Sequence, residues 1–235
     1  MAILTSDPKI LAMAFLGGII PSLLWLWFWL NEEENPEPKI LLAIIFIMGM
    51  LSVVVVLPIE KLVQMNVSSN AGQIILWASA EEILKYLAVF IILYKSNYTK
   101  KPINWPIYLI TSALGFAALE NTLFLIKPLS ASGATLSLLT ATSLGQLRFL
   151  GSTLLHTISS GIIGIAIGIS FFMEKSTKKW FLFFGFLFAI ALHSAFNFFI
   201  MRNDGNDFFK VFAFLWVVTI IVMLLFEKVR RMSEN

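Results

Sequence analysis

Seven apolar segments follow one another along the chain, and short stretches of polar and charged residues separate them. About 20 apolar residues make one helix across the hydrocarbon core of a bilayer, and each segment reaches or nearly reaches that length. The pattern predicts an all-α, polytopic membrane helix bundle of about seven transmembrane helices, in a single integral membrane domain spanning residues 1–235. The predicted spans are residues 10–30, 40–57, 72–94, 106–126, 147–173, 180–200 and 208–226.

Basic residues are distributed unevenly between these segments. Clusters follow the third, fifth and seventh segments, at Lys95, Lys100, Lys101, Lys175, Lys178, Lys179, Lys228, Arg230 and Arg231. In membrane proteins the cytoplasmic loops carry the excess of Lys and Arg. The distribution therefore predicts an N-terminus outside and a C-terminus in the cytoplasm, with the first segment retained and not removed as a signal peptide.

The longest connection, residues 127–146, is rich in Ser, Thr, Gly and Ala. We interpret it as a solvated outer loop. The alternative is a re-entrant or interfacial helix, which is allowed at membrane depth only where protein or water covers its backbone. Arg148 follows this connection, and we expect its side chain to extend to the membrane interface.

The composition agrees with a membrane location and excludes several kinds of site. Of the 235 residues, 58% are hydrophobic and 13% are charged, whereas soluble domains have roughly 45–50% and about 25%. The formal net charge of +3 is spread over short connections, so no basic face indicates nucleic-acid binding. The sequence has no cysteine, which excludes disulfides, iron–sulfur clusters and thiolate zinc sites.

Seven ionisable residues nevertheless lie inside the predicted spans: Glu81, Glu82, Lys85, Glu120, Arg148, His156 and His193. A charged group at the bilayer centre costs about 2.5–3.5 kcal/mol on insertion scales, so such groups must face the bundle interior and satisfy one another. Counted at about 1.5 Å per residue, the three carboxylates and the two histidines share one depth in the outer half of the membrane. The sequence therefore predicts that they meet in a polar cavity.

Each of these groups also has a purely structural interpretation. Lys85 follows the two glutamates by three and four residues, so one helical turn can neutralise part of its own charge, although one carboxylate is left over. Glu120 and Asn121 can form a polar contact between helices. His193 and Asn197 are four residues apart and project from one helix face, and a single buried histidine is usually only hydrogen-bonded.

These side chains are suited to two kinds of hydrolysis. They offer carboxylates, imidazoles, an amide and one lysine. In the first, a carboxylate and an imidazole activate water as general base and acid, while a second histidine and the asparagine stabilise a developing oxyanion. In the second, Glu and His hold a divalent, zinc-like ion that lowers the pKa of its bound water. Both kinds describe hydrolysis within the membrane, and both stay open at this point.

Four motifs, in order along these segments, resemble those of the PrsW-type intramembrane proteases. They are EEILK (81–85), FAALEN (116–121), His156 and HSAFN (193–197), and the resemblance covers residues 72–200. In the related CAAX-prenyl protease and bacteriocin-processing group, Arg follows the paired Glu motif and the second motif ends in His. Lys85 and Glu120 stand at those places here, which favours the PrsW branch.

The resemblance implies an intramembrane endopeptidase that cuts a membrane protein or single-span peptide, such as an anti-sigma factor, on the extracytoplasmic side. The location that it implies is a prokaryotic cytoplasmic (inner) membrane, with the lipid bilayer as surroundings and no nucleic-acid partner. The catalytic residues that it implies are Glu81, Glu82, Glu120, His156, His193 and Asn197, supported by Lys85, Phe116 and Asn121.

Within that set, the resemblance implies that Glu81 or Glu82 activates water and that His193 with Asn197 binds the scissile carbonyl. Lys85 would hold the Glu pair in place. The cofactor is expected to be zinc, with a metal-free, glutamate-dependent mechanism as the alternative. If a metal is bound, the expected ligands are Glu82, Glu120, His156 and His193.

Two other functions compete with proteolysis. A proton- or ion-coupled carrier also uses intramembrane Glu, Lys and His, but the sequence lacks the inverted repeats and paired broken helices that many carriers show. A catalytically silent membrane scaffold on the same fold is the third hypothesis, because a fold does not guarantee activity. All the motif residues are intact here, which favours the enzyme.

Overall fold

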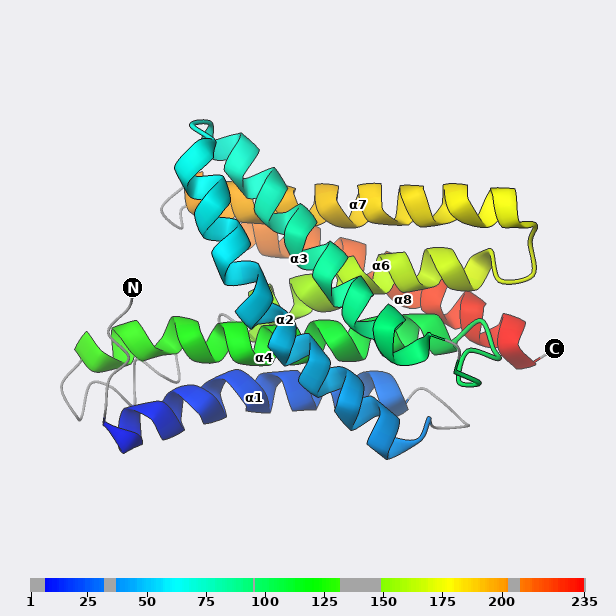
Figure 1. Cartoon of the computed structure of the whole chain (residues 1–235), viewed down its shortest axis with the longest axis horizontal. Coiled ribbons are helices and arrows are strands. Elements are labelled where there is room, and N and C mark those ends of the chain that lie inside the picture. Colours follow the sequence, from blue (N-terminus) through cyan, green and yellow to red (C-terminus); the bar gives the residue numbers. More distant parts are fainter. Residues whose placement is uncertain (1–6, 32–36, 95, 132–148, 203–207, 235) are drawn as a thin grey trace.

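The computed structural model describes residues 7–31, 37–94, 96–131, 149–202 and 208–234, and every regular element within them is helical. These residues form seven long helices (Figure 1) and one π-helical turn: α1 (Pro8–Asn31), α2 (Lys39–Asn66), α3 (Asn70–Leu93), α4 (Asn104–Ala131), η1 (Phe149–Thr153), α6 (Leu154–Ile169), α7 (Lys175–Arg202) and α8 (Phe208–Glu234). The predicted all-α class is confirmed, and each predicted span corresponds to one long helix.

Six of these helices are long and apolar enough to cross a bilayer. The seventh, α3, has 24 residues, which gives a length of about 36 Å at about 1.5 Å per residue. It is less apolar because it carries Glu81, Glu82 and Lys85, and all three side chains are buried. The charges of α3 therefore face the interior of the bundle.

Several helix ends differ from the prediction. α2 continues through Pro58 to Asn66 instead of ending at residue 57, because transmembrane helices tolerate proline where neighbours satisfy the backbone. α4 continues through Pro128 to Ala131, so the connection predicted from residue 127 begins later. The rest of that connection, and Arg148, lie outside the described residues.

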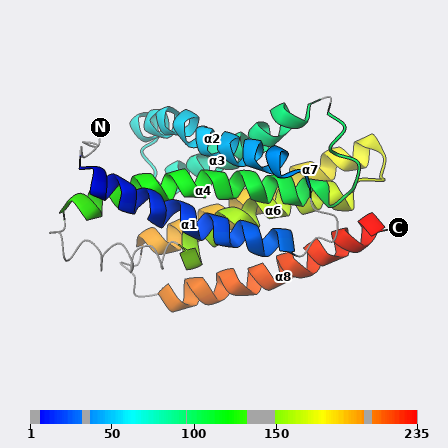
Figure 2. The same cartoon turned by 90° about the horizontal axis from the view of Figure 1, so that it is seen from below.

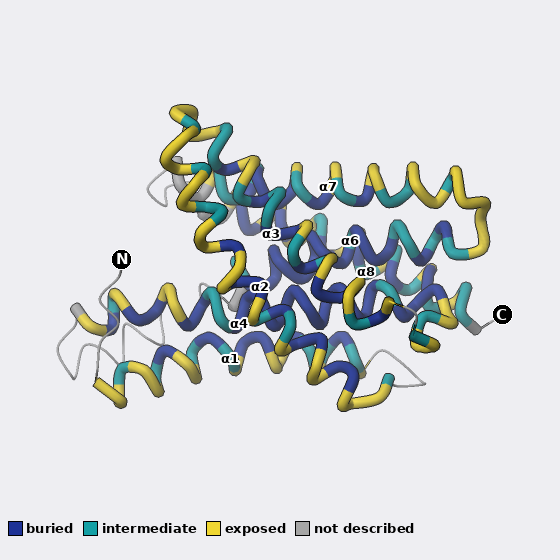
Figure 3. The backbone as a smooth tube through the Cα atoms, viewed as in Figure 1, coloured by how far each residue is buried: buried dark blue, intermediate teal, exposed yellow. Residues whose placement is uncertain are grey.

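α4 and α6 form the centre of the bundle. α4 contacts α1, α2, α3 and α6, while α6 also contacts α7 and α8. Figures 1 and 2 show α2 and α3 on one side of this pair and α8 on the opposite side. Buried residues follow α4 and α6, and the exposed residues of α2 and α7 face outward in Figure 3. All seven long helices contribute to one apolar core cluster.

Small residues bring α2 very close to α4. Gly49 of α2 faces the backbone of Ser112, and Gly115 of α4 faces the backbone of Phe46. A Cβ atom at either glycine would overlap a carbonyl oxygen of the other helix. Glycine at such positions permits close helix contact inside a membrane. These two contacts fix the point at which α2 crosses α4 (Figure 1).

The bundle has two ends, called the turn end and the C-terminal end. The turn end holds the connection between α2 and α3, and α1, α6 and α8 begin there (Figure 1). The C-terminal end is the opposite one, where α4 and α7 begin and α8 finishes.

Candidate active site

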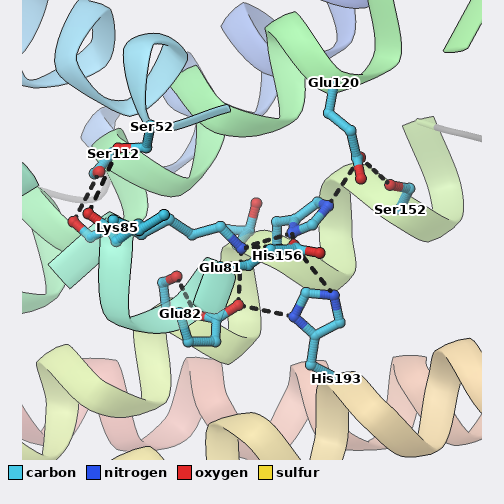
Figure 4. Close-up of polar contacts among 12 residues, drawn as sticks. Ser52, Glu81, Glu82, Lys85, Ser112, Glu120, Ser152, His156 and His193 are labelled. Atoms are coloured by element: carbon cyan, nitrogen blue, oxygen red, sulfur yellow. Dashed lines mark hydrogen bonds and ion pairs between the residues drawn. The ribbon is translucent and has the colours of Figure 1, made fainter. Parts of the chain in front are cut away.

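Lys85 of α3 lies fully buried at the centre of a polar cluster (Figure 4). Its Nζ is 2.8 Å from Glu82 Oε1, 2.8 Å from His156 Nδ1 and 3.6 Å from Glu81 Oε2. An ammonium group only donates hydrogen bonds, so His156 Nδ1 accepts in this arrangement. The Phe116 ring covers the ammonium, with its centroid 4.3 Å from Nζ. Lys85 thus joins the carboxylates of α3 to a histidine of α6.

Glu82 uses both of its carboxylate oxygens. Oε1 accepts a hydrogen bond from Lys85 and lies 2.9 Å from His193 Nδ1, while Oε2 accepts a hydrogen bond from Ser160 Oγ at 2.6 Å. The residue is 0% exposed. A buried carboxylate is tolerated when it is paired and hydrogen-bonded in this way. Glu82 therefore ties α3 to α6 and to α7.

Each histidine is backed by a different carboxylate. His156 Nε2 lies 3.1 Å from Glu120 Oε2, and that oxygen also accepts a hydrogen bond from Ser152 Oγ at 3.4 Å. His193 Nδ1 is held by Glu82, as described above. The two rings lie edge to face, with centroids 4.9 Å apart. The remaining nitrogens, His156 Nδ1 and His193 Nε2, both face Glu81.

Glu81 differs from the other members of the cluster. Its Oε2 atom is buried and has no hydrogen-bond partner among the described residues. It lies 3.6 Å from His193 Nε2 and 3.7 Å from His156 Nδ1. A buried polar atom without a partner costs about 1–3 kcal/mol, and in native proteins such an atom often has a catalytic or ion-binding role. Glu81 Oε2 is therefore the carboxylate oxygen of the cluster that is left without a hydrogen bond within the described residues.

Glu81, His156 and His193 fit a divalent metal ion. Their ligand atoms lie within 4.8 Å of one another, and one carboxylate with two imidazoles is a donor set of catalytic zinc sites. Histidines that bind metal commonly donate their other ring N–H to a carboxylate, and both histidines have that contact here. Lys85 already contacts His156 Nδ1, so an ion on that nitrogen would displace this contact.

The structure brings together five of the six residues predicted to be catalytic: Glu81, Glu82, Glu120, His156 and His193. Asn197 lies one turn beyond His193 in α7, is half-buried and has no hydrogen bond to the cluster within the described part of the chain. Asn121 is buried and donates from Nδ2 to Thr153 Oγ1 at 2.9 Å, so it supports the π turn η1 and not the cluster directly. The catalytic roles of all six residues stay predictions.

The expected metal ligands stay a prediction. They included Glu82 and Glu120 and omitted Glu81, whereas in the structure both oxygens of Glu82 are engaged and Glu81 is the carboxylate grouped with the two histidines. The polar groups were also expected to line a cavity, whereas these side chains contact one another directly (Figure 4). The physical reason is Lys85, whose ammonium fills the space between the carboxylates and His156.

Sequence analysis missed Glu60. This residue lies on α2 beyond the predicted end of that span, and its carboxyl group is close enough to Glu81 to interact with it electrostatically. A signal was present, because Val53, Val56 and Glu60 are spaced by three and four residues along one helix face. The two valines are buried, and Glu60 continues their stripe.

The fold and the site define a class: a polytopic membrane protein whose interior holds a Glu and His group suited to metal-assisted hydrolysis. The sequence comparisons then give the family. The profile of the PrsW family of intramembrane metalloproteases matches residues 37–226, and the chain belongs to that family. It is thus an integral membrane protein of an intramembrane protease family, which confirms the predicted enzyme class.

Three relatives share most of their length with this chain. The protease PrsW of Shouchella clausii is 26% identical over 226 residues, covering 93% of this chain and 96% of the relative. The protease PrsW of Geobacillus kaustophilus is 26% identical over 80% of this chain and 79% of the relative. The protease PrsW of Clostridioides difficile is 29% identical over the same shares of both. No solved structure matches the chain.

Proposed function

We propose that this chain hydrolyses peptide bonds of membrane-anchored proteins at the group formed by Glu81, His156 and His193. The observation that carries the proposal is Glu81 Oε2, which is buried, lacks a partner among the described residues and faces both imidazoles. Glu81 accepts the proton of an attacking water, and Asn197 donates a hydrogen bond to the oxyanion that develops on the scissile carbonyl. His193 also donates to this oxyanion, from Nε2, when both of its ring nitrogens carry a proton, because Nδ1 already donates to Glu82. A zinc ion held by Glu81, His156 and His193 would instead activate the water by lowering its pKa.

The remaining residues of the cluster hold this group in place. Glu82 orients His193 through Nδ1, and Glu120 orients His156 through Nε2. Lys85 neutralises one carboxylate charge and contacts both glutamates of α3. Fixed surroundings of this kind lower the cost of reorganisation when charge develops during the reaction.

We further propose that the turn end of the bundle is extracytoplasmic and that the membrane is a prokaryotic cytoplasmic membrane. Among the Lys and Arg residues that the structure describes, nine lie toward the C-terminal end: Lys39, Lys100, Lys101, Lys175, Lys178, Lys179, Lys228, Arg230 and Arg231. The positive-inside rule assigns that end to the cytoplasm. Glu81 lies near the middle of α3, whereas Glu120, His156 and His193 lie in the halves of their helices nearer the turn end.

The test is metal content and cleavage measured on the same detergent-purified samples. Wild type, Glu81→Gln and His193→Ala are compared by elemental mass spectrometry and by cleavage of a single-span reporter, with Glu227→Gln as a control carboxylate on α8. Near one zinc per chain in wild type and the control, lost with cleavage in the two site variants, would support the metal-dependent form. Cleavage without stoichiometric metal would support water activation by Glu81 alone. Unchanged cleavage in both site variants would refute the site.

A further inference from the structure

The polar cluster is closed on most sides and open on one. Glu82, Lys85, His156 and His193 are at most 2% exposed, and Glu81 is 4% exposed. The Glu120 side chain, in contrast, is 33% exposed, and Glu60 is half-buried. These two carboxyl groups belong to α4 and α2. The cluster is therefore accessible from the side of the bundle that α2 and α4 form.

α2 and α4 are in close contact only over part of their length. Toward the C-terminal end they touch at Gly49 and at Gly115, with backbone against backbone. Toward the turn end, Leu119 of α4 is partly buried and packs against the apolar cluster of Val53, Val56 and Phe116. One turn further along α4, Leu123 is 37% exposed. The two helices therefore separate toward the turn end, as Figure 1 shows.

The same change occurs on α2. Val53 is buried, whereas Leu57, one turn further along the same face, is 47% exposed. Glu60 follows one turn later on the buried stripe and reaches Glu81. Its backbone carbonyl accepts a hydrogen bond from Trp77 Nε1 at 3.1 Å, which ties this part of α2 to α3. Glu60 therefore lies near Glu81, on the part of α2 that has separated from α4.

We infer that the substrate polypeptide enters sideways from the bilayer, between the parts of α2 and α4 nearer the turn end. This inference rests on the proposed function, since it assumes that a membrane-anchored protein must reach Glu81. The mouth of the path is formed by Leu57, Glu60, Glu120 and Leu123. The occupant is an extended stretch of the substrate, because carboxylates at the mouth accept hydrogen bonds and only unwound peptide offers free N–H groups.

Single-cysteine cross-linking tests the path directly, because the chain has no cysteine of its own. The variants are Leu57→Cys and Leu123→Cys at the mouth, and Val217→Cys as the matched control on α8. Leu57 and Val217 are both exposed, at 47% and 57%, and both lie nine residues from the turn end of their helices (66 − 57 and 217 − 208). The partner is a single-span reporter with one cysteine beside its cleavage site.

The path predicts disulfide adducts at both mouth positions, at least about tenfold stronger than at Val217→Cys, because a disulfide forms only between closely spaced residues. Equal or stronger adducts at Val217→Cys would overturn the path. The proposed function is tested by a separate measurement, reporter cleavage by the wild type. Absence of that cleavage would contradict the proposed function. Adduct formation does not require cleavage, so the two failures are distinguishable.

A second measurement keeps the inference testable if a cysteine variant does not fold. Leu57→Trp narrows the mouth and should raise KM about fivefold or more with kcat largely retained, which is the signature of impaired binding. Val217→Trp should leave KM unchanged, and thermal melting checks that both variants fold. A wild-type KM for Leu57→Trp would contradict entry between α2 and α4.

Discussion

Glu81 and Glu82 are consecutive residues of α3, but their surroundings differ. Glu82 is completely buried and its two oxygens contact Lys85, His193 and Ser160. Glu81 is almost as buried, yet its Oε2 atom has no hydrogen-bond partner among the described residues. One helix therefore presents, side by side, a fully paired carboxylate and a carboxylate whose Oε2 atom has no hydrogen bond within the described residues (Figure 4).

The difference shows how a membrane bundle can keep a reactive group in its interior. A buried ion pair gains little net stability but becomes strongly destabilising when one partner is removed. Lys85 and Glu82 form such a pair and connect three helices. Glu81 is held beside them at a longer distance, 3.6 Å from Lys85. Its unpartnered oxygen stays available to water, to a metal ion or to substrate.

The largest expected effect is on activity, at Glu81. Glu81→Gln should lower reporter cleavage by about 10²- to 10⁴-fold, the usual contribution of a general base. Its free energy of unfolding should change by less than about 1 kcal/mol, because no hydrogen bond to a described residue is lost at Oε2. Glu82→Gln should lose activity and stability together. If both variants melt alike in detergent, the contrast between the two glutamates is wrong.

The next largest effect is on stability, at Lys85. Lys85→Met should reduce the free energy of unfolding by about 3–5 kcal/mol, because it leaves buried carboxylates without their nearest cation. Lys61→Met removes an exposed lysine of α2 and is the control. Thermal or denaturant unfolding in detergent measures both. Equal stability of the two variants would show that Lys85 does not hold the pair together.

The smallest expected effect is a difference in stability between variants of two neighbouring serines. Ser160 donates a hydrogen bond to Glu82 Oε2 at 2.6 Å, whereas Ser159 Oγ is buried without a partner among the described residues. Ser160→Ala should cost about 1.5–3 kcal/mol, as for a hydrogen bond to a charged group, and Ser159→Ala should be nearly neutral. Melting curves of the two variants check this. A greater loss for Ser159→Ala would contradict the assignment of Ser160 to Glu82.

Much of the fold and the membership of the site could be predicted from the sequence. Apolar runs of about 20 residues identify spans, and charged residues within them are rare enough to indicate an interior site. Glu81, Glu82, Glu120, His156 and His193 were found in that way. Glu60 was missed because Pro58, Glu60 and Lys61 resemble the end of a helix, whereas α2 continues to Asn66.

The sequence by itself determined the number of long helices and which ionisable residues lie inside them, because bilayer thickness is a constraint on local chain length. Only the tertiary structure decided that Glu82 is paired and that Glu81 Oε2 has no partner among the described residues. It also decided that Glu60 reaches Glu81 and that α2 and α4 separate toward the turn end. These features depend on how each helix is rotated and where it crosses its neighbours, and close backbone contacts at Gly49 and Gly115 set that crossing.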